Sequence, residues 1–140
     1  MDQLISVLRN KGFKITPQRR AVIKALCECG KFPTAQHVLE HVRKNAPDVS
    51  FDTIYRNLSL LADLGVVHEI QTKGREGNVF EIVTSSHHHH LICVTCGITK
   101  CLDFCPISEN DLKRAQADGF EVTSHSLEFY GYCKECRNAS

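Results

Sequence analysis

Apolar residues recur at helical spacing in four segments of the first half of the chain, and helix-starting or helix-ending residues bound each segment. Thr16 and Ser50 are good N-caps, and Pro17 suits the first position of a helix. Gly12 and Gly65 stand where a helix is expected to end. Helices are therefore expected over residues 2–10, 18–26, 34–46 and 51–64.

Two β-branched runs follow the fourth predicted helix. VVHEI at 66–70 and NVFEIV at 78–83 are joined by QTKGREG, a loop with two glycines, which predicts a β-hairpin. Several short helices followed by a hairpin is the order of a winged helix-turn-helix, in which the fourth helix enters the major groove of DNA and the hairpin is the wing. A small helical domain with no nucleic-acid role is the alternative, because a fold does not fix a function.

The pattern changes after residues 84–86, which read Thr-Ser-Ser. A run of four histidines leads into LICVTCG, and a short helix over 108–117 and a strand-like stretch over 120–133 follow. We therefore expect two domains, over residues 1–83 and 84–140. Each is too small to bury a generous core alone, so a metal, disulfides or a partner subunit is expected to support it.

The two parts also differ in charge. Residues 1–60 carry ten Lys and Arg against five Asp and Glu, whereas residues 84–140 carry five against seven. This modest basic excess in the first part favours a polyanionic partner such as DNA. The sequence shows no secretory signal and no apolar run near the ~18 residues of a membrane span, which indicates a cytoplasmic protein without a membrane partner.

Cys93-x-x-Cys96 and Cys133-x-x-Cys136 give the strongest chemical signal in the sequence. Two pairs of thiolates at this spacing complete a tetrahedral shell around one zinc ion, and four thiolates leave no open position, so the site is expected to be structural. Gly97 suits the tight turn after the first pair. Two disulfides or unrelated thiols are the alternatives, but a reducing cytosol favours zinc.

Four consecutive histidines form the second candidate metal site. In a strand, alternate side chains point to opposite faces, so His88 and His90 share one face, while His87 and His89 share the other. Neutral imidazoles paired in this way bind zinc, iron, manganese or nickel. The two pairs can therefore serve two different sites.

Further possible ligands lie in the predicted wing and farther along the chain. His68 in the first wing strand and Glu81 in the second can reach the first of these faces, so that a metal would tie the wing to the second domain. His125, with Glu109 as an oxygen donor, is a candidate for the opposite face. A solvated polar strand is the alternative interpretation, because nothing local requires ligation.

No arrangement of catalytic residues is visible. The sequence has no G-x-S-x-G, no P-loop and no G-x-G-x-x-G in a strand–helix context. It also lacks the H-E-x-x-H motif of hydrolytic zinc enzymes. We therefore expect a protein that is not an enzyme.

Four blocks of sequence occur over nearly the whole chain: ITPQR at 15–19, SFDTIYRNLSLLADLGVV at 50–67, HHHHLICVTCG at 87–97 and FYGYCKEC at 129–136. In content and order they resemble the ferric uptake regulator (Fur) superfamily. The resemblance implies a homodimeric bacterial repressor with an α+β fold, in which an N-terminal winged helix precedes a small α/β dimerisation domain. It also implies structural zinc on the four cysteines and a regulatory metal that switches on binding to double-stranded operator DNA.

Within the family, SFDTIYRNLSL and the CG-x-T-K-x(4)-CP pattern at 96–106 look most like zinc uptake regulators (Zur). This resemblance implies a zinc-responsive repressor that controls metal homeostasis, with an iron-, manganese- or peroxide-responsive regulator as the alternative. A zinc-binding interaction module without DNA binding is the alternative from another class. The residues implied to contact DNA are Arg19, Ser50, Thr53, Tyr55 and Arg56. The implied regulatory ligands are His68, Glu81, His88 and His90, and those of a further site are His87, His89, Glu109 and His125.

Three departures from the family pattern bear on the regulatory metal. Zinc sensors of the family often have a cysteine near Val83, which this chain lacks there. Iron- and peroxide-type members have a histidine just before the third helix, where this chain has Phe32. The carboxylate that follows the zinc knuckle matches Asp103 or is replaced by Cys101. The roles of the remaining cysteines stay open: Cys27, Cys29 and Cys105.

Overall fold

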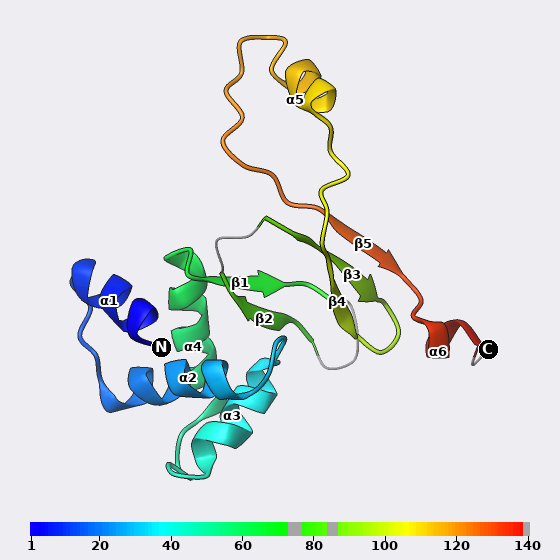
Figure 1. Ribbon diagram of the computed structural model, residues 1–140. Helices are drawn as coiled ribbons and strands as arrows, with labels where there is room; N and C mark the ends of the chain where they lie inside the picture. Colours follow the sequence, from blue (N-terminus) through cyan, green and yellow to red (C-terminus); the bar gives the residue numbers. More distant parts are fainter. Residues whose placement is uncertain (73–76, 84–86, 139–140) are drawn as a thin grey trace.

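The computed structural model of the chain describes residues 1–72, 77–83 and 87–138. Within these ranges a helical part is followed by a two-stranded hairpin and then by a separate three-stranded sheet (Figure 1). The tip of the predicted hairpin loop and the predicted domain boundary fall on residues 73–76 and 84–86, which lie outside the described ranges.

The four predicted helices are present, and side-chain caps begin three of them. They are α1 (Asp2–Asn10), α2 (Pro17–Glu28), α3 (Ala35–Arg43) and α4 (Phe51–Asp63). The hydroxyls of Thr16, Thr34 and Ser50 each accept the backbone N–H three residues on, which satisfies a donor that the first helical turn cannot pair internally. None of the helices in the described ranges is long and apolar enough to cross a membrane.

The helices pack around one apolar core, because each turns a stripe of aliphatic side chains inward. Phe80 of the hairpin is the largest fully buried side chain of the described residues. Its ring meets that of Tyr55 in α4 edge-on, with 6.1 Å between the centroids. The hairpin therefore completes the core of the helical part. The aliphatic side chains buried with Phe80 include Leu8, Ile23, Ile54, Leu58 and Val67.

The hairpin consists of β1 (Val67–Ile70) and β2 (Val79–Ile82), which pair antiparallel. Successive side chains of a strand point to opposite faces, so Phe80 enters the helical core while Glu81 turns away from it. Glu81 is nevertheless buried, with 5% of its surface exposed. A buried carboxyl group needs polar partners, and the C-terminal sheet supplies them on the far side of the hairpin.

The C-terminal sheet contains β3 (His89–Cys93), β4 (Thr99–Leu102) and β5 (Glu128–Gly131) in the order β4-β3-β5. β3 is antiparallel to β4 and parallel to β5. Between β4 and β5 the chain makes a long excursion that carries α5 (Glu109–Ala115). Figure 1 shows this arm projecting away from the rest of the molecule. α6 (Lys134–Asn138) follows β5.

The predicted α+β class is confirmed, with an N-terminal winged helix followed by a small α/β domain. The second part differs from the prediction in detail. Of the strand-like stretch at 120–133, only β5 is a strand, and the sequence does not predict β4 or α6. Here backbone pairing with β3, and not apolar periodicity, determines where strands form.

The C-terminal part has almost no apolar core of its own. From residue 87 onward, Ile92 and Cys93 are the only hydrophobic residues of the described ranges that are buried. Large apolar side chains such as Leu91, Phe129 and Tyr132 are exposed instead. Hydrophobic burial alone is therefore too small to stabilise this part, and a metal or a partner chain has to contribute.

The position of Phe80 generates a test of the fold. Phe80→Ala should lower the free energy of unfolding of the helical part by ~3–5 kcal/mol, because it leaves a cavity where the hairpin meets the helices. Urea denaturation followed by far-ultraviolet circular dichroism measures the change. Phe120→Ala is the matched control, since Phe120 is 70% exposed and its loss should leave the midpoint nearly unchanged. Equal effects of the two substitutions would contradict this packing.

Candidate metal centres and nucleic-acid interface

Three groups of four potential ligands occur among the described residues. In each group, one ligand atom from every side chain lies within 4.8 Å of the others. The first group contains thiols alone, and the other two combine histidines with a thiol, one of them with a carboxylate as well. The groups are Cys93, Cys96, Cys133 and Cys136; Glu81, His88, His90 and Cys101; and His87, His89, Cys105 and His125.

The four-cysteine group is assembled by the parallel pairing of β3 and β5. Cys93 at the end of β3 lies opposite Gly131 of β5, so the turn after β3 and the start of α6 come together. Gly97 takes a φ of 80° in this turn, a conformation that a side chain disfavours. Cys96 Sγ and Cys133 Sγ are 3.9 Å apart, far beyond a disulfide bond, and all eight cysteines are free thiols.

Hydrogen bonding within this group separates the thiol pKa values. The backbone N–H groups of Cys96 and Cys133 lower the pKa of Cys93 to about 6, because they stabilise its thiolate. Hydrogen bonds with the sulfurs of Cys133 and Cys93 raise the pKa of Cys136 to about 12. Four sulfurs this close cannot all be thiolates without a cation to offset their repulsion. A zinc ion fits this donor set, since it binds four thiolates in tetrahedral geometry and displaces their protons.

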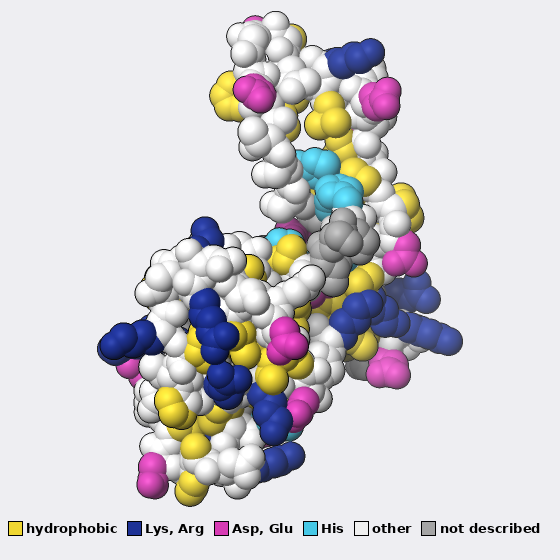
Figure 2. All heavy atoms as spheres, turned by 60° about the vertical axis from the view of Figure 1, so that its left-hand side comes forward, with side chains coloured by type: hydrophobic (Ala, Val, Ile, Leu, Met, Phe, Trp, Pro, Cys, Tyr) yellow, Lys and Arg dark blue, Asp and Glu magenta, His cyan; other side chains and the backbone are white. Residues whose placement is uncertain are grey.

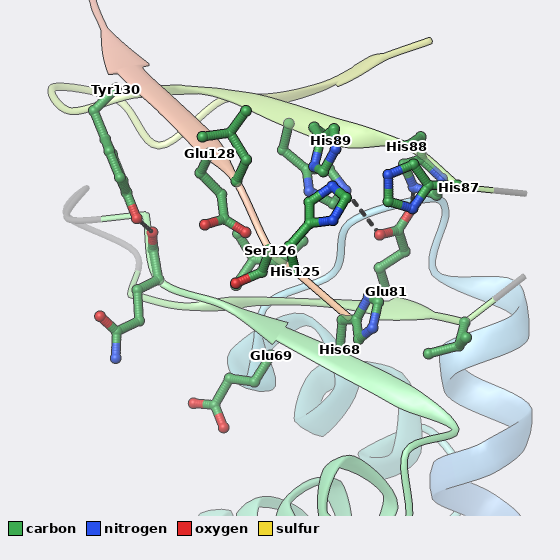
Figure 3. Close-up of a pocket in the computed structure, with 15 residues that line it drawn as sticks. His68, Glu69, Glu81, His87, His88, His89, His125, Ser126, Glu128 and Tyr130 are labelled. Carbon is green, nitrogen blue, oxygen red and sulfur yellow. Dashed lines mark hydrogen bonds and ion pairs between the residues drawn. The ribbon is translucent and has the colours of Figure 1, made fainter. Parts of the chain in front are cut away.

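The second group joins the hairpin to the C-terminal sheet. Glu81 Oε1 lies 2.7 Å from His88 Nε2 (Figure 3). The other carboxylate oxygen, Glu81 Oε2, lies 2.8 Å from His90 Nε2. Cys101 of β4 is the neighbour of His90 across the sheet, which brings its sulfur into the same group. Two imidazoles, a carboxylate and a thiol thus converge from β2, β4 and the start of β3. Such a set can bind one divalent metal.

Two residues expected near this site lie outside the group of four. His68 is paired with Glu81 in the hairpin register and lines the same cavity of about 550 Å³, but its side chain is exposed. Asp103 is also exposed. The sequence offered Asp103 or Cys101 as the next possible ligand after the four-cysteine motif, and it is Cys101 that lies in the group. The structure therefore brings Glu81, His88 and His90 together with the Cys101 thiol and leaves His68 on the wall of the same cavity, outside the group.

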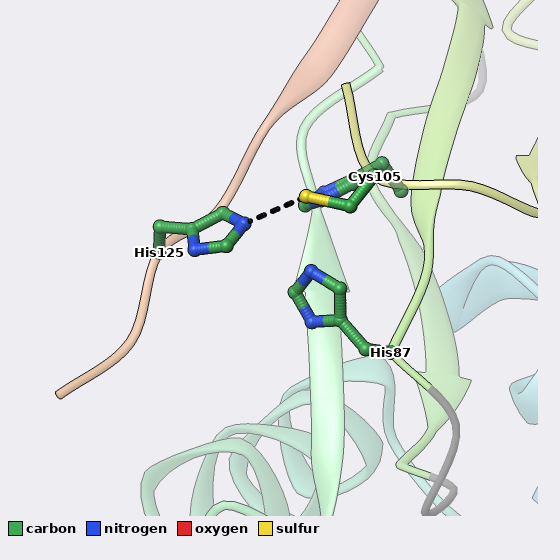
Figure 4. Close-up of side chains that lie close together, drawn as sticks. His87, Cys105 and His125 are labelled. Carbon is green, nitrogen blue, oxygen red and sulfur yellow. Dashed lines mark hydrogen bonds between the residues drawn. The ribbon is translucent and has the colours of Figure 1, made fainter. Parts of the chain in front are cut away.

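The third group lies on the opposite face of β3, at the base of the projecting arm. Cys105 Sγ is 3.3 Å from His89 Nε2. It is also 3.3 Å from His125 Nε2, and the rings of His87 and His125 are 4.8 Å apart (Figure 4). Burial, and then the neighbouring His87 and His125, lower the pKa of His89, which favours the neutral imidazole that metals bind. Glu109, the oxygen donor expected here, begins α5 on the exposed arm and lies outside the group.

Cys105 completes the third group, although the sequence left its role open. It lies between β4 and α5 in a segment with no regular secondary structure, so no strand or helix period places it. The sequence feature that could have indicated it is the Cys105-Pro106 pair, which follows Cys93-x-x-Cys96 by nine residues. Cys27 and Cys29, at the end of α2, belong to none of the three groups.

The residues expected to contact DNA lie on α4 and the start of α2. Arg19 and Arg56 line a shallow depression together with Gln18, Thr53 and Asn57. Arg56 is exposed and pairs with Asp52 at 3.0 Å, whereas Arg19 is held by the Lys14 carbonyl at 2.8 Å. Ser50 caps α4 and donates a hydrogen bond to Thr53. On the face shown in Figure 2, Lys and Arg side chains follow one another down the helical part.

Tyr55 is placed differently from the other expected DNA contacts. Its hydroxyl donates a hydrogen bond to Glu69 of β1 at 2.5 Å, and Asn78 donates to the same carboxylate at 2.8 Å. The ring is half-buried against Phe80. Tyr55 therefore joins the predicted recognition helix to the hairpin, and the proton of its hydroxyl is already donated to Glu69.

A winged helix and a small four-cysteine domain share a histidine–carboxylate–thiol group, an arrangement that fits the class of metal-dependent DNA-binding proteins. The model of the ferric uptake regulator family matches residues 10–130, and the chain belongs to this family. Its members are metal-responsive transcriptional regulators, not enzymes, and bind operator DNA as dimers.

Comparison with individual proteins agrees with this assignment. The chain is 36% identical to the peroxide-responsive repressor PerR of Staphylococcus aureus over 140 residues, covering 99% of this chain and 92% of that protein. It is 39% identical to a ferric uptake regulation protein of Staphylococcus epidermidis over 137 residues, covering 97% and 95% of the two chains. Its fold resembles that of the Helicobacter pylori ferric uptake regulator, with a TM-score of 0.80, 23% identity, and coverage of 99% of this chain and 91% of that one.

The four-cysteine group generates the second test. Cys93→Ser or Cys136→Ser should release about one zinc per chain and unfold or monomerise the C-terminal part, because a structural zinc contributes folding free energy directly. Elemental analysis and light scattering measure the two effects. Cys27→Ser is the matched control, since this exposed thiol lies outside the three groups. A folded, dimeric protein without metal and without all four cysteines would rule out the structural role.

Proposed function

We propose that this protein is a homodimeric, metal-dependent transcriptional repressor that controls metal homeostasis in response to zinc. It would bind double-stranded operator DNA through the winged helix over residues 1–83 and dimerise through residues 84–140. The observation that carries the proposal is the contact of Glu81, from the wing, with His88 and His90 beside the C-terminal sheet. A metal held by these side chains belongs to both domains at once.

Such a metal can control DNA binding through the angle between the domains. A ligand shifts a conformational equilibrium only if it binds one conformation better than the other. Glu81 can join the two histidines on one metal only when the wing lies against the C-terminal sheet. The metal therefore favours that arrangement, and with it one spacing of the two recognition helices of a dimer. A coupling of ~1–3 kcal/mol changes the affinity for DNA by about 5- to 150-fold.

The donor set supports zinc as the regulatory metal. Two imidazole nitrogens, one carboxylate oxygen and one thiolate sulfur are four donors, the number that zinc takes in tetrahedral sites. A thiolate is a soft ligand that favours zinc, whereas manganese favours oxygen ligands and octahedral geometry. Cys101 thus supplies the sulfur that the sequence lacks near Val83. An iron-, manganese- or peroxide-responsive regulator is the alternative within the family.

Exposed apolar side chains support the dimer. Leu91, Ile98, Phe129 and Tyr132 border a hollow on the C-terminal sheet, and each is at least 42% exposed. A surface of this kind on a domain with so little core is suited to a second copy of the chain. The group of His87, His89, Cys105 and His125 would hold a further metal at the base of the arm.

The switch generates the third test. His90→Ala and Cys101→Ser should each abolish zinc-dependent DNA binding while the structural zinc and the dimer remain. His68→Ala is the matched comparison and should have a smaller effect, because His68 lies outside the group. Fluorescence anisotropy measures binding, at buffered free zinc, to a duplex that the zinc-loaded parent selects from random sequences. A parent that responds to iron or manganese but not to zinc would favour the alternative regulators.

The DNA-contacting residues generate the fourth test. Arg56→Ala should weaken binding to the selected duplex by ~1–3 kcal/mol if the side chain reaches a base. Arg19→Ala, as a phosphate contact, should weaken all sequences alike and lower the salt slope by about one. Arg114→Ala in the projecting arm is the control. Normal salt-dependent duplex binding by both variants would favour an interaction module without a DNA role, and loss of metal from either would contradict the separation of the two sites.

A further inference from the structure

The loop between α2 and α3 touches the Glu81–His88–His90–Cys101 group without contributing a ligand to it. The ring of Phe32 stands edge-on to the imidazole of His90, with 5.6 Å between the centroids and 85° between the planes. Phe32 also packs against Ile70, Val79 and Ile92, which are the apolar residues between the hairpin and the C-terminal sheet. An apolar ring therefore stands at the metal group on the side that faces the helical domain.

The backbone holds Phe32 in this place. The carbonyl of Pro33 accepts the N–H of Phe80 at 2.8 Å, and Thr34 forms a bridge with Val79. Both contacts are to β2, the strand that carries Glu81. Thr34 is buried and caps α3. The loop is thus bonded directly to the strand that carries Glu81, and these contacts place the Phe32 ring beside the group.

The neighbouring residue of the loop contacts a second ligand. A hydrogen bond between the Lys31 ammonium and the Cys101 sulfur raises the pKa of Lys31, and this ammonium also lies 5.8 Å from the centre of the Phe32 ring. An ammonium group has no lone pair to give to a metal, and neither has a phenyl ring. The loop therefore places a phenyl ring and an ammonium group, neither of which has a lone pair to donate, beside His90 and Cys101.

The spacing of the rings indicates that a histidine at position 32 would lie close enough to the group to act as a ligand. His88 and His90, which share the group, have ring centroids 5.1 Å apart, and the rings of His89 and His125 in the third group are 5.2 Å apart. The 5.6 Å between Phe32 and His90 is close to these values. The distance between the rings of Phe32 and His90 is therefore close to the distance between two imidazoles that belong to one group of potential ligands.

We infer that Phe32 is a specificity-determining residue of the regulatory site, which excludes a fifth ligand and thereby keeps the site four-coordinate. This inference rests on the proposed function, in which Glu81, His88, His90 and Cys101 bind the regulatory metal. An apolar ring beside His90 keeps water and other ligands away on the side of the group that faces the helical domain, where a five- or six-coordinate ion would otherwise take up a further ligand. Zinc accepts four ligands, whereas manganese favours octahedral geometry, so the ring selects zinc.

The test uses cobalt(II) as a probe, since its visible absorption is strong in tetrahedral sites and weak in five- or six-coordinate ones. It is done on the full chain with zinc in the four-cysteine site and with Cys105→Ser and His125→Ala present, so that the signal comes from the regulatory group. Phe32→His adds a nitrogen donor, Phe32→Ala admits water, and Phe32→Leu is the control that keeps an apolar side chain. Chelator competition gives the zinc and manganese affinities of each variant.

The parent and Phe32→Leu should give the strong tetrahedral spectrum and the same preference for zinc. Phe32→His should lose much of this intensity and lower the ratio of zinc to manganese affinity by at least about tenfold. Phe32→Ala should lower the cobalt intensity and the affinity ratio in the same direction and to a smaller extent. If Phe32→His does not fold, Phe32→Ala provides the test of the role of Phe32. Spectra and affinity ratios that are the same in all variants would overturn the role of Phe32. A parent whose cobalt signal survives Cys101→Ser would instead overturn the proposed regulatory site.

Discussion

The carboxylate of Glu81 is buried between the hairpin and the C-terminal sheet, where each of its oxygens faces one imidazole. A carboxylate in such a place must be compensated, because burying it unpaired would cost several kcal/mol or more. His88 and His90 meet this requirement with hydrogen bonds, and a divalent cation held by the same side chains would meet it with its own charge. The contact between the hairpin and the sheet depends on this compensation.

Phe80, the residue before Glu81 in β2, connects the hairpin to α4, the predicted recognition helix. Phe80 points to the opposite face of the hairpin and packs against Tyr55 of α4, whose hydroxyl is bound to Glu69 of β1. The hairpin thus has one face directed to the candidate metal site and the other to the predicted recognition helix. Side chains on both faces belong to the same strand backbone. A displacement of the hairpin relative to the sheet therefore changes the contacts of Glu81 on one face and of Phe80 on the other.

Local signals predict much of this structure. The caps at Thr16 and Ser50 and the apolar stripes predict the four helices, since these depend on residues a few positions apart. The alternation of a strand likewise predicts that His88 and His90 share one face and His87 and His89 the other. Cys101 and Cys105 could not be assigned in this way. Their positions depend on the pairing of β4 with β3 and on the path of the arm, which are long-range contacts with no short sequence signature.

The arm between β4 and β5 has a consequence for chain entropy. α5 has no buried residue, so the arm is not held along its length by packing. At its base, however, Cys105 and His125 lie side by side although 20 positions separate them in the sequence. Closing a loop of this size costs ~3 kcal/mol of chain entropy, and a metal bound by both residues supplies such a closure as a disulfide would. If the third group held a metal, residues 105–125 would form a closed loop, whereas without one they would form a long connection between β4 and β5.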